Sequence, residues 1–352
     1  MWTAAGRQAR NPRSKSVRSI LWKVCVGLCL AGAGLVFQAQ AQNLPTGNPK
    51  DFKVKTCLHS VSYSGAWRGQ TVLTLDQFLE KAHELGYDGV EIMAKRPHLS
   101  PLDYDDAARQ KLRAHIERLG LKLVALAAYS DFSAGMDKPG IPQVEIQAAY
   151  LGEVARLAHD LGCNMVRVFT GYDREGIPYD QQYAAVMLGL RLGGQQAARY
   201  GVTLAVQNHH DLGVTYEGMY WLLKEVNQPN VMAAWDAWSP AAQGYTPAEI
   251  RQSIQKLKPF LVHTTAAQYI SVPRFHYMPD IVDYQKTLPV NLEIPMTSAG
   301  LIDYDSFFNA LKEIGFQGYV AYEICAVTEG GGSIENLDRV AKSFLEYMNK
   351  FR

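Results

Sequence analysis

Residues 201–209 read Gly-Val-Thr-Leu-Ala-Val-Gln-Asn-His, a short apolar run that ends in polar side chains. Leu204, Ala205 and Val206 form its centre, and Gln207 closes it. A short apolar run between a glycine and a polar cluster is typical of a buried strand in a parallel sheet. The run therefore predicts a strand that carries a polar side chain at its carboxyl end.

Seven similar runs lie elsewhere between residue 52 and the carboxyl terminus, and each is followed by a longer amphipathic segment. Thr74 and Gln77 look like a capping box at the start of one such segment, and Gly86 follows it as a stop. Eight strand and helix pairs in about 300 residues predict one α/β domain, a single (β/α)8 TIM barrel, over residues 42–352. The predicted strands are Lys53–His59, Gly89–Met93, Lys122–Ala128, Met165–Thr170, Val202–Asn208, Val231–Asp236, Phe260–Thr264 and Tyr319–Ile324.

A doubly wound dinucleotide-binding sheet is the competing architecture. The turn after the first predicted strand reads Ser60-Val-Ser-Tyr-Ser-Gly65, and it lacks the Gly-x-Gly-x-x-Gly fingerprint. The sequence therefore disfavours dinucleotide binding. The long segment of residues 265–300 exceeds an ordinary connection, and we expect it to form an elaborated loop over the barrel mouth.

Residues 1–41 are predicted to be a secretory signal peptide. They hold six Lys or Arg and no Asp or Glu, followed by the apolar run 24–37 and by Ala39-Gln40-Ala41. Cleavage after Ala41 leaves 29 of the 35 basic residues against 34 acidic ones, a net charge of −5. This predicts a periplasmic or secreted protein with no nucleic-acid partner and no membrane anchor after cleavage. An uncleaved amino-terminal anchor is the alternative.

Four polar residues close the fifth to eighth predicted strands, where barrel enzymes carry their reactive groups. They are Gln207, Asp236, His263 and Glu323. Together they would offer three oxygen ligands and one nitrogen ligand. A single Asp or His that ends a strand can also be a hydrogen-bonding residue, so a structural role for each remains open.

At these positions the chain resembles the xylose isomerase-like barrels, a superfamily that includes sugar isomerases and epimerases, inosose dehydratases and apurinic endonucleases. The resemblance is carried by Gly86-Tyr-Asp-Gly-Val-Glu91, the run 201–209, Asp236, His263, Gly300-Leu-Ile-Asp303 and Gly315-Phe-Gln-Gly-Tyr-Val-Ala-Tyr-Glu323. It implies that Gln207, Asp236, His263 and Glu323 hold one divalent metal ion. The chain departs from the family at Gln207, where a glutamate is usual, and a glutamine cannot exchange a proton. A mixed oxygen and nitrogen set suits Mn²⁺ first, with Co²⁺, Zn²⁺ or Mg²⁺ as alternatives.

The proton-transfer candidates are Glu323 and His209. The resemblance gives the glutamate at the eighth strand an acid and base role. His209 follows Gln207 by two positions, so it faces the same side if the strand continues, and imidazole can exchange a proton near neutral pH. Candidates for substrate binding are Glu91, Lys95, Arg167 and Trp238. For these four, ion pairing or loop packing is the structural alternative.

These features predict a metal-dependent isomerase or epimerase that acts on a keto-sugar through an enediolate. The same site would serve a lyase, dehydratase or hydratase, for example on 3-keto-glycosides, if the intermediate expelled a leaving group. A noncatalytic sugar-binding barrel is the alternative from another class. An endonuclease is disfavoured by the acidic mature chain. The expected partner is a small sugar, and a homo-oligomer is an open alternative.

Overall fold

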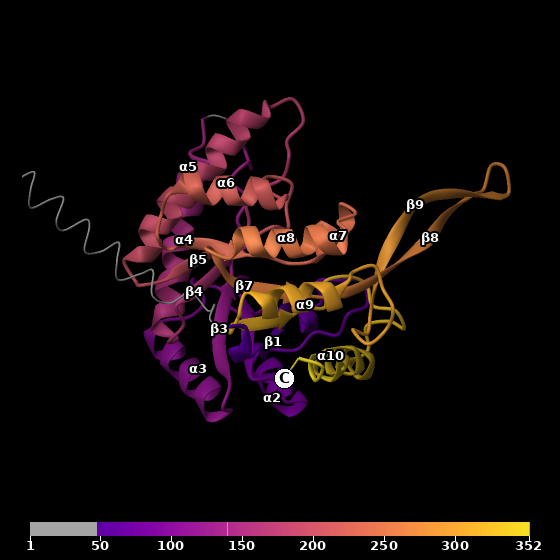
Figure 1. The fold of residues 1–352 in the computed structure, drawn as a ribbon, viewed down its shortest axis with the longest axis horizontal. Coiled ribbons are helices and arrows are strands. Elements are labelled where there is room, and N and C mark those ends of the chain that lie inside the picture. Colours follow the sequence, from indigo (N-terminus) through magenta and orange to yellow (C-terminus); the bar gives the residue numbers. More distant parts are fainter. Residues whose placement is uncertain (1–47, 139, 352) are drawn as a thin grey trace, which may run out of the picture. The chain divides into compact units, whose positions relative to one another are not determined.

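The computed structural model describes residues 48–138 and 140–351, so the predicted signal peptide lies outside the described residues. Eight of the described strands are parallel and close into a barrel, with β10 hydrogen-bonded to both β7 and β1 (Figure 1). In barrel order they are β1 Lys55–His59, β2 Gly89–Met93, β3 Lys122–Ala127, β4 Met165–Val168, β5 Thr203–Gln207, β6 Val231–Ala234, β7 Leu261–Ala266 and β10 Tyr319–Tyr322. The predicted (β/α)8 barrel is confirmed.

Helices connect successive strands on the outside of the barrel. They are α2 Leu75–Leu85, α3 Asp106–Arg118, α4 Gln143–Asp160, α5 Tyr179–Ala198, α6 Tyr216–Val226, α7 Trp238–Ala242, α8 Pro247–Leu257, α9 Tyr304–Glu313 and α10 Ile334–Met348, with short 3-10 turns η1 Pro49–Asp51 and η2 Ser60–Tyr63. None of the helices in the described part of the chain is long and apolar enough to cross a membrane.

The first described helix, α2, forms as its capping residues predict. The Thr74 hydroxyl accepts a hydrogen bond from the backbone of Gln77 at 3.3 Å, and Gln77 Oε1 accepts one from the backbone of Thr74 at 2.9 Å. Gly86 ends the helix with φ of 89°, a left-handed conformation that suits glycine. Phe78 and Leu79 are fully buried on its inner face, and each contributes about 2 kcal/mol to folding.

A polar layer lies inside the barrel near the carboxyl ends of the strands. Its side chains are at most 2% exposed, and they belong to His59, Glu91, Arg167, Gln207 and His263. Burial of charged groups is costly unless each has a partner. The hydrogen bonds and ion pairs within this layer therefore decide which of its side chains are left to bind a ligand at the barrel mouth.

The segment expected to form a loop over the mouth is instead a hairpin of two long antiparallel strands, β8 Gln268–Met278 and β9 Asp283–Ile294. Figure 1 shows this ribbon extending away from the barrel. Tyr269 and Glu293 at its base are buried, whereas Val282 near its tip is 75% exposed. Only the base of the hairpin therefore packs against the barrel. The rest can extend away from the barrel because cross-strand hydrogen bonds satisfy its backbone.

Candidate active site

The four predicted metal ligands are all buried near the carboxyl ends of their strands. Gln207 is the last residue of β5, Asp236 follows β6 by two residues, and Glu323 follows β10 directly. His263 lies deeper, as the third residue of β7, which continues to Ala266. None of the four side chains is more than 7% exposed. The barrel thus collects them at one end, but not at one height.

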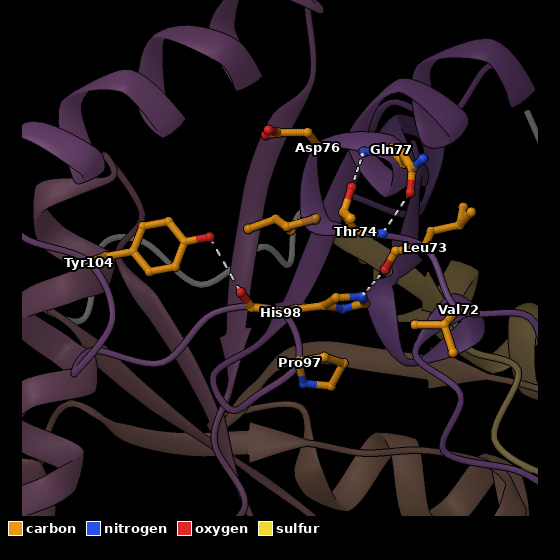
Figure 2. A pocket seen from close by; sticks show the side chains of 9 residues that line it. Val72, Leu73, Thr74, Asp76, Gln77, Pro97, His98 and Tyr104 are labelled. Carbon is orange, nitrogen blue, oxygen red and sulfur yellow. Dashed lines mark hydrogen bonds between the residues drawn. The ribbon is translucent and has the colours of Figure 1, made fainter.

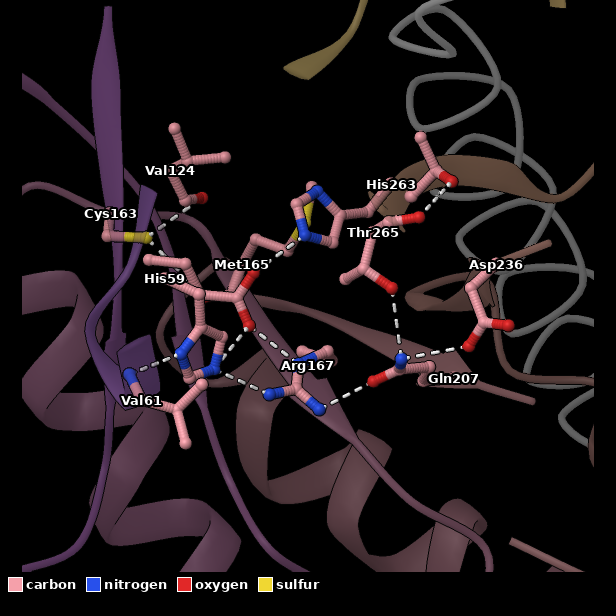
Figure 3. A network of polar contacts seen from close by, with 12 residues as sticks. His59, Val61, Val124, Cys163, Met165, Arg167, Gln207, Asp236, His263 and Thr265 are labelled. Atoms are coloured by element: carbon pink, nitrogen blue, oxygen red, sulfur yellow. Dashed lines mark hydrogen bonds and ion pairs between the residues drawn. The ribbon is translucent and has the colours of Figure 1, made fainter. Parts of the chain in front are cut away.

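Arg167 of β4 lies at the centre of the polar layer (Figure 3). Its Nε donates to Glu91 Oε1 at 2.6 Å, and its Nη1 donates to Gln207 Oε1 at 2.5 Å. Nη2 lies 2.7 Å from Nε2 of His59. The ring of Phe169 covers the guanidinium, with its centroid 4.8 Å from Cζ. Two guanidinium nitrogens therefore donate to oxygen acceptors, as a buried cation requires, and the third lies beside the His59 ring, whose Nδ1 already accepts from the backbone N–H of Val61.

Glu91 is the negative partner of this cation. Burial by itself would raise the pKa of Glu91, but Arg167 and the rings of His59 and His263 outweigh burial and lower it below its usual range. His263 Nε2 lies 2.8 Å from Glu91 Oε2. Burial lowers the pKa of His59 to about 3, so this ring is neutral at neutral pH. Arg167 and Glu91 consequently form the charged pair of the layer.

The side-chain amide of Gln207 is held on both sides. Its oxygen accepts from Arg167, and its Nε2 donates to Asp236 Oδ2 at 2.9 Å and to Thr265 Oγ1 at 3.1 Å. A glutamine binds a metal ion through its oxygen. Here that oxygen already faces a cation, and the nitrogen faces the carboxylate. Gln207 thereby links Arg167 to Asp236, and a metal ion bound to its oxygen would lie beside the guanidinium.

His263 and Thr265 share the inward face of β7, because residues two apart on a strand point the same way. His263 contacts Glu91 in the polar layer. Thr265, one step nearer the mouth, accepts from Gln207 and lines the cavity described below. The neutral hydroxyl of Thr265, and not the imidazole of His263, is therefore the side chain of β7 that faces the cavity.

The strand register explains why His263 is not beside Asp236. A shift in the pairing of β6 makes Ala234 the partner of His263, and beyond that pair Gln207 Nε2 contacts both Asp236 and Thr265. Within residues 48–138 and 140–351, no three His, Cys, Asp or Glu side chains are grouped so that they could hold a metal ion. The residues present therefore do not fit the predicted divalent ion.

A small cavity opens among the side chains at the carboxyl end of the barrel. Its lining includes the carboxylates of Asp236 and Glu323 and the rings of His209, Trp238 and Tyr269. The Trp238 ring lies 5.1 Å from the His209 ring and 6.0 Å from the Tyr269 ring, centroid to centroid. The volume is about 10 Å³, room for one water molecule. A larger molecule therefore enters only if an aromatic ring moves.

Both carboxyl groups of the cavity hold a proton more tightly than usual. Burial raises the pKa of Glu323 to about 7, although Arg167 acts in the opposite direction. Burial also raises the pKa of Asp236, whose Oδ1 accepts from the backbone of Trp238 at 2.9 Å and of Ser239 at 3.2 Å. A carboxyl group that titrates near neutral pH is suited to general acid and base catalysis.

The other predicted site residues are divided between three places. His209 and Trp238 line the cavity with Glu323, so the structure brings together both proton-transfer candidates. Glu91 and Arg167 bind each other in the layer beneath. Lys95 lies apart from the cavity lining, with Nζ 3.6 Å from the centroid of the Tyr129 ring, and partial burial followed by the charge of Arg167 lowers its pKa.

Sequence reasoning missed Thr265 and His59. The alternation of β7 offered a signal for Thr265, since a strand extended by two residues puts it on the same face as His263. His59 ends the first predicted strand, as the four proposed ligands end theirs. Both residues therefore carried the strand-end signal that identified the others.

A larger hollow of about 350 Å³ lies outside the barrel, at the start of α2 (Figure 2). Thr74 and Gln77 are bonded to each other there, and His98 Nε2 lies 3.1 Å from the carbonyl oxygen of Leu73. Among the described residues that line it, Asp76 alone is acidic. This hollow lies away from the carboxyl end of the barrel, where enzymes with this fold carry their catalytic groups, so the barrel mouth remains the candidate site.

Comparison with known proteins identifies the same type of barrel. A family model described as a xylose isomerase-like TIM barrel matches residues 79–349. No curated protein sequence matches the chain.

Several solved structures share the fold. A D-psicose 3-epimerase with D-tagatose from Clostridium cellulolyticum H10 matches with a TM-score of 0.63 at 18% identity, over 85% of this chain and 99% of that one. A D-allulose 3-epimerase from Methylomonas sp. in complex with D-allulose gives 0.62 at 17%, over 88% and 100%. The probable 3-DHS dehydratase involved in petrobactin synthesis from Bacillus anthracis gives 0.61 at 17%, over 84% and 99%. At such identities the likeness shows the fold alone.

Proposed function

Since this chain belongs to the xylose isomerase-like TIM barrel family, we propose that it is an enzyme that moves protons at a carbon next to a carbonyl group of a sugar or keto-sugar. One observation carries the proposal. The carboxyl groups of Asp236 and Glu323 line a single cavity with His209 at the carboxyl end of the barrel. That end is where enzymes with this fold carry their catalytic groups.

Glu323 is the group that takes the proton from carbon. A hydrogen next to a carbonyl group is acidic enough for a carboxylate base, and its removal leaves an enediolate. Return of the proton to the former carbonyl carbon isomerises the sugar, because the hydroxyl on the deprotonated carbon passes its proton to the former carbonyl oxygen and becomes the new carbonyl group. Delivery by His209 to the opposite face of the deprotonated carbon inverts it, which is epimerisation.

A sugar substrate is supported by the aromatic cover of the cavity. Trp238 and Tyr269 offer flat apolar surfaces, which suit the apolar face of a sugar ring. Two of the structural neighbours are named as 3-epimerases of the sugars psicose and allulose. Because the cavity has room for one water molecule only, we expect these rings to move when the substrate binds.

Elimination or hydration of a keto-sugar is the second candidate reaction. Gln207 cannot exchange a proton, so the fifth strand supplies no carboxylate base. Removal of one proton followed by loss of a β-leaving group needs only one such base. The structural neighbour named as a dehydratase is consistent with this chemistry on the fold.

The location and assembly remain part of the proposal. We propose export to the periplasm by the segment 1–41, with 42–352 as the mature barrel, and a free sugar as the partner. The exposed apolar side chains of the β8–β9 hairpin, Leu288 among them, offer a surface for a homo-oligomer. No step of the proposed reaction uses the predicted divalent ion, because the donor set does not fit it.

The test is incubation of the purified protein in D₂O with a panel of free ketoses and 3-keto-glycosides, followed by NMR. Uptake of deuterium with an isomeric product is expected for an isomerase or epimerase, and an unsaturated or hydrated product for the second candidate. Glu323→Gln must lose the activity, whereas Glu346→Gln on the exposed face of α10 must retain it. Sugar binding without any product would identify the noncatalytic alternative.

A further inference from the structure

We propose that the buried guanidinium of Arg167 is the resident cation of this barrel, that the chain works without a divalent metal ion, and that Arg167 is a positioning residue for Asp236. The inference rests on the proposed function only for its kinetic test, because metal binding is measured without substrate.

The first step is the fixed position of the guanidinium. Nε, Nη1 and Nη2 of Arg167 lie between 2.5 and 2.7 Å from Glu91, Gln207 and His59, and the side chain is 2% exposed. A guanidinium keeps its charge at any pH a protein tolerates. With three neighbours that come from three different strands, it is a permanent part of the barrel interior.

The second step is the direction of the Gln207 amide. Its oxygen accepts from Arg167, and its nitrogen donates to Asp236 and Thr265. To ligate a cation through its second lone pair, the oxygen would have to hold a second positive charge beside the guanidinium. Like charges at such close range repel strongly in a buried site, where the effective dielectric constant is low. The arrangement therefore opposes metal binding.

The third step is the donor set at the height of the cavity. Asp236 and Glu323 are its carboxylates, and Gln207 and Thr265 are neutral groups already bonded to each other. His263, the nitrogen donor of β7, contacts Glu91 instead. His209 also lines the cavity, but no three His, Cys, Asp or Glu side chains of the described residues are grouped so that they could hold Mn²⁺, Co²⁺ or Zn²⁺.

The contacts also give Arg167 a positioning role. Arg167 fixes Gln207, and Gln207 donates to Oδ2 of Asp236, whose Oδ1 is held by the backbone of Trp238 and Ser239. Both oxygens of Asp236 therefore have set directions. The Arg167 side chain does not line the cavity, so it acts on the site through Gln207 and through its charge.

The metal arm of the test uses the purified protein stripped with EDTA and then titrated with MnCl₂ by calorimetry, with metal content read by mass spectrometry. Less than about 0.1 equivalent of retained metal and no saturable Mn²⁺ binding are expected. One equivalent of bound Mn²⁺ would overturn the inference, whether or not the protein turns over any sugar. A protein that binds no metal and shows no activity would support the absence of a metal site and refute the proposed function.

A variant designed to bind a metal ion tests whether Arg167 and the donor set are what oppose metal binding. The triple variant Arg167→Met, Gln207→Glu and Thr265→His removes the resident cation and supplies a carboxylate and an imidazole at the height of the cavity. We expect it to bind about one Mn²⁺ and to show a melting temperature that rises with MnCl₂. The control is Arg174→Met, which removes an arginine paired with Asp131 outside the cavity lining and must bind no Mn²⁺. Equal Mn²⁺ binding by the wild-type protein and the folded triple variant would refute the role of Arg167.

The kinetic arm uses Arg167→Lys, which keeps the charge and loses the three-way contact. Because Asp236 loses its orientation, kcat should fall by about 10 to 100 fold while KM changes little. Added Mn²⁺ should not restore it. An unchanged kcat in a folded Arg167→Lys variant would contradict the positioning role.

Discussion

Replacing Glu323 by Gln should stabilise the protein at alkaline pH and leave its stability unchanged in acid. Burial raises the pKa of this carboxyl group from the ordinary 4.5 to about 7. The protonated side chain therefore contributes stability that is fully present below about pH 4.5 and lost as the pH rises through about 7. Glutamine has no proton to lose, so the variant escapes this loss.

The size of the effect follows from the two pKa values. Each tenfold change in proton affinity corresponds to about 1.4 kcal/mol, so moving from 4.5 to about 7 corresponds to about 3 kcal/mol. Glu323 is 7% exposed, so solvent screens this energy little. At about pH 4 the variant and the wild type should have the same free energy of unfolding. Above about pH 8 the free energy of unfolding of the variant should exceed that of the wild type by about 3 kcal/mol.

The assay is urea unfolding followed by tryptophan fluorescence at several values between about pH 4 and pH 9. Glu346→Gln is the matched control, since it makes the same chemical change at an exposed side chain of α10. A Glu323→Gln difference that is the same in acid and in alkali would refute the assigned pKa. A difference that grows towards acid would show that the carboxylate, and not the acid, is the stable form in the fold.

Three further predictions concern export, proton transfer and packing. Amino-terminal sequencing of the exported protein should give Gln42, whereas a full-length cytoplasmic product would refute the signal peptide. His209→Ala should lower kcat by about 100 fold with the fold retained, as measured by circular dichroism, because the second proton-transfer group is lost, and an unchanged rate would make this ring structural. Gly189→Ala should destabilise the protein by about 1 to 3 kcal/mol in urea unfolding, because its Cβ would lie 2.1 Å from the buried Phe132 ring, whereas Gly140→Ala, in open space, should change little.

Much of the fold could be predicted because the signals are local. Thr74, Gln77 and Gly86 set the bounds of α2 by contacts within one segment, and the apolar runs mark the eight barrel strands. The hairpin of β8 and β9 could not be predicted in the same way. Most of its side chains are exposed, so hydrophobic patterning gives a weak signal there, and residues 265–300 looked like a loop.

The sequence by itself determined the barrel and the polar residues that end its strands, because strand periodicity and capping depend on neighbours in the chain. Only the tertiary structure decided which of these residues meet. The register of β6 against β7 pairs Ala234 and not Asp236 with His263, and the fold brings Arg167 to Glu91 across 76 positions of sequence. The alternation of side chains along a strand shows which face of the strand a residue lies on. It does not give the height of that residue in the barrel, which depends on strand tilt and stagger. That height separates His263 from the cavity and leaves Gln207 bonded to the guanidinium of Arg167.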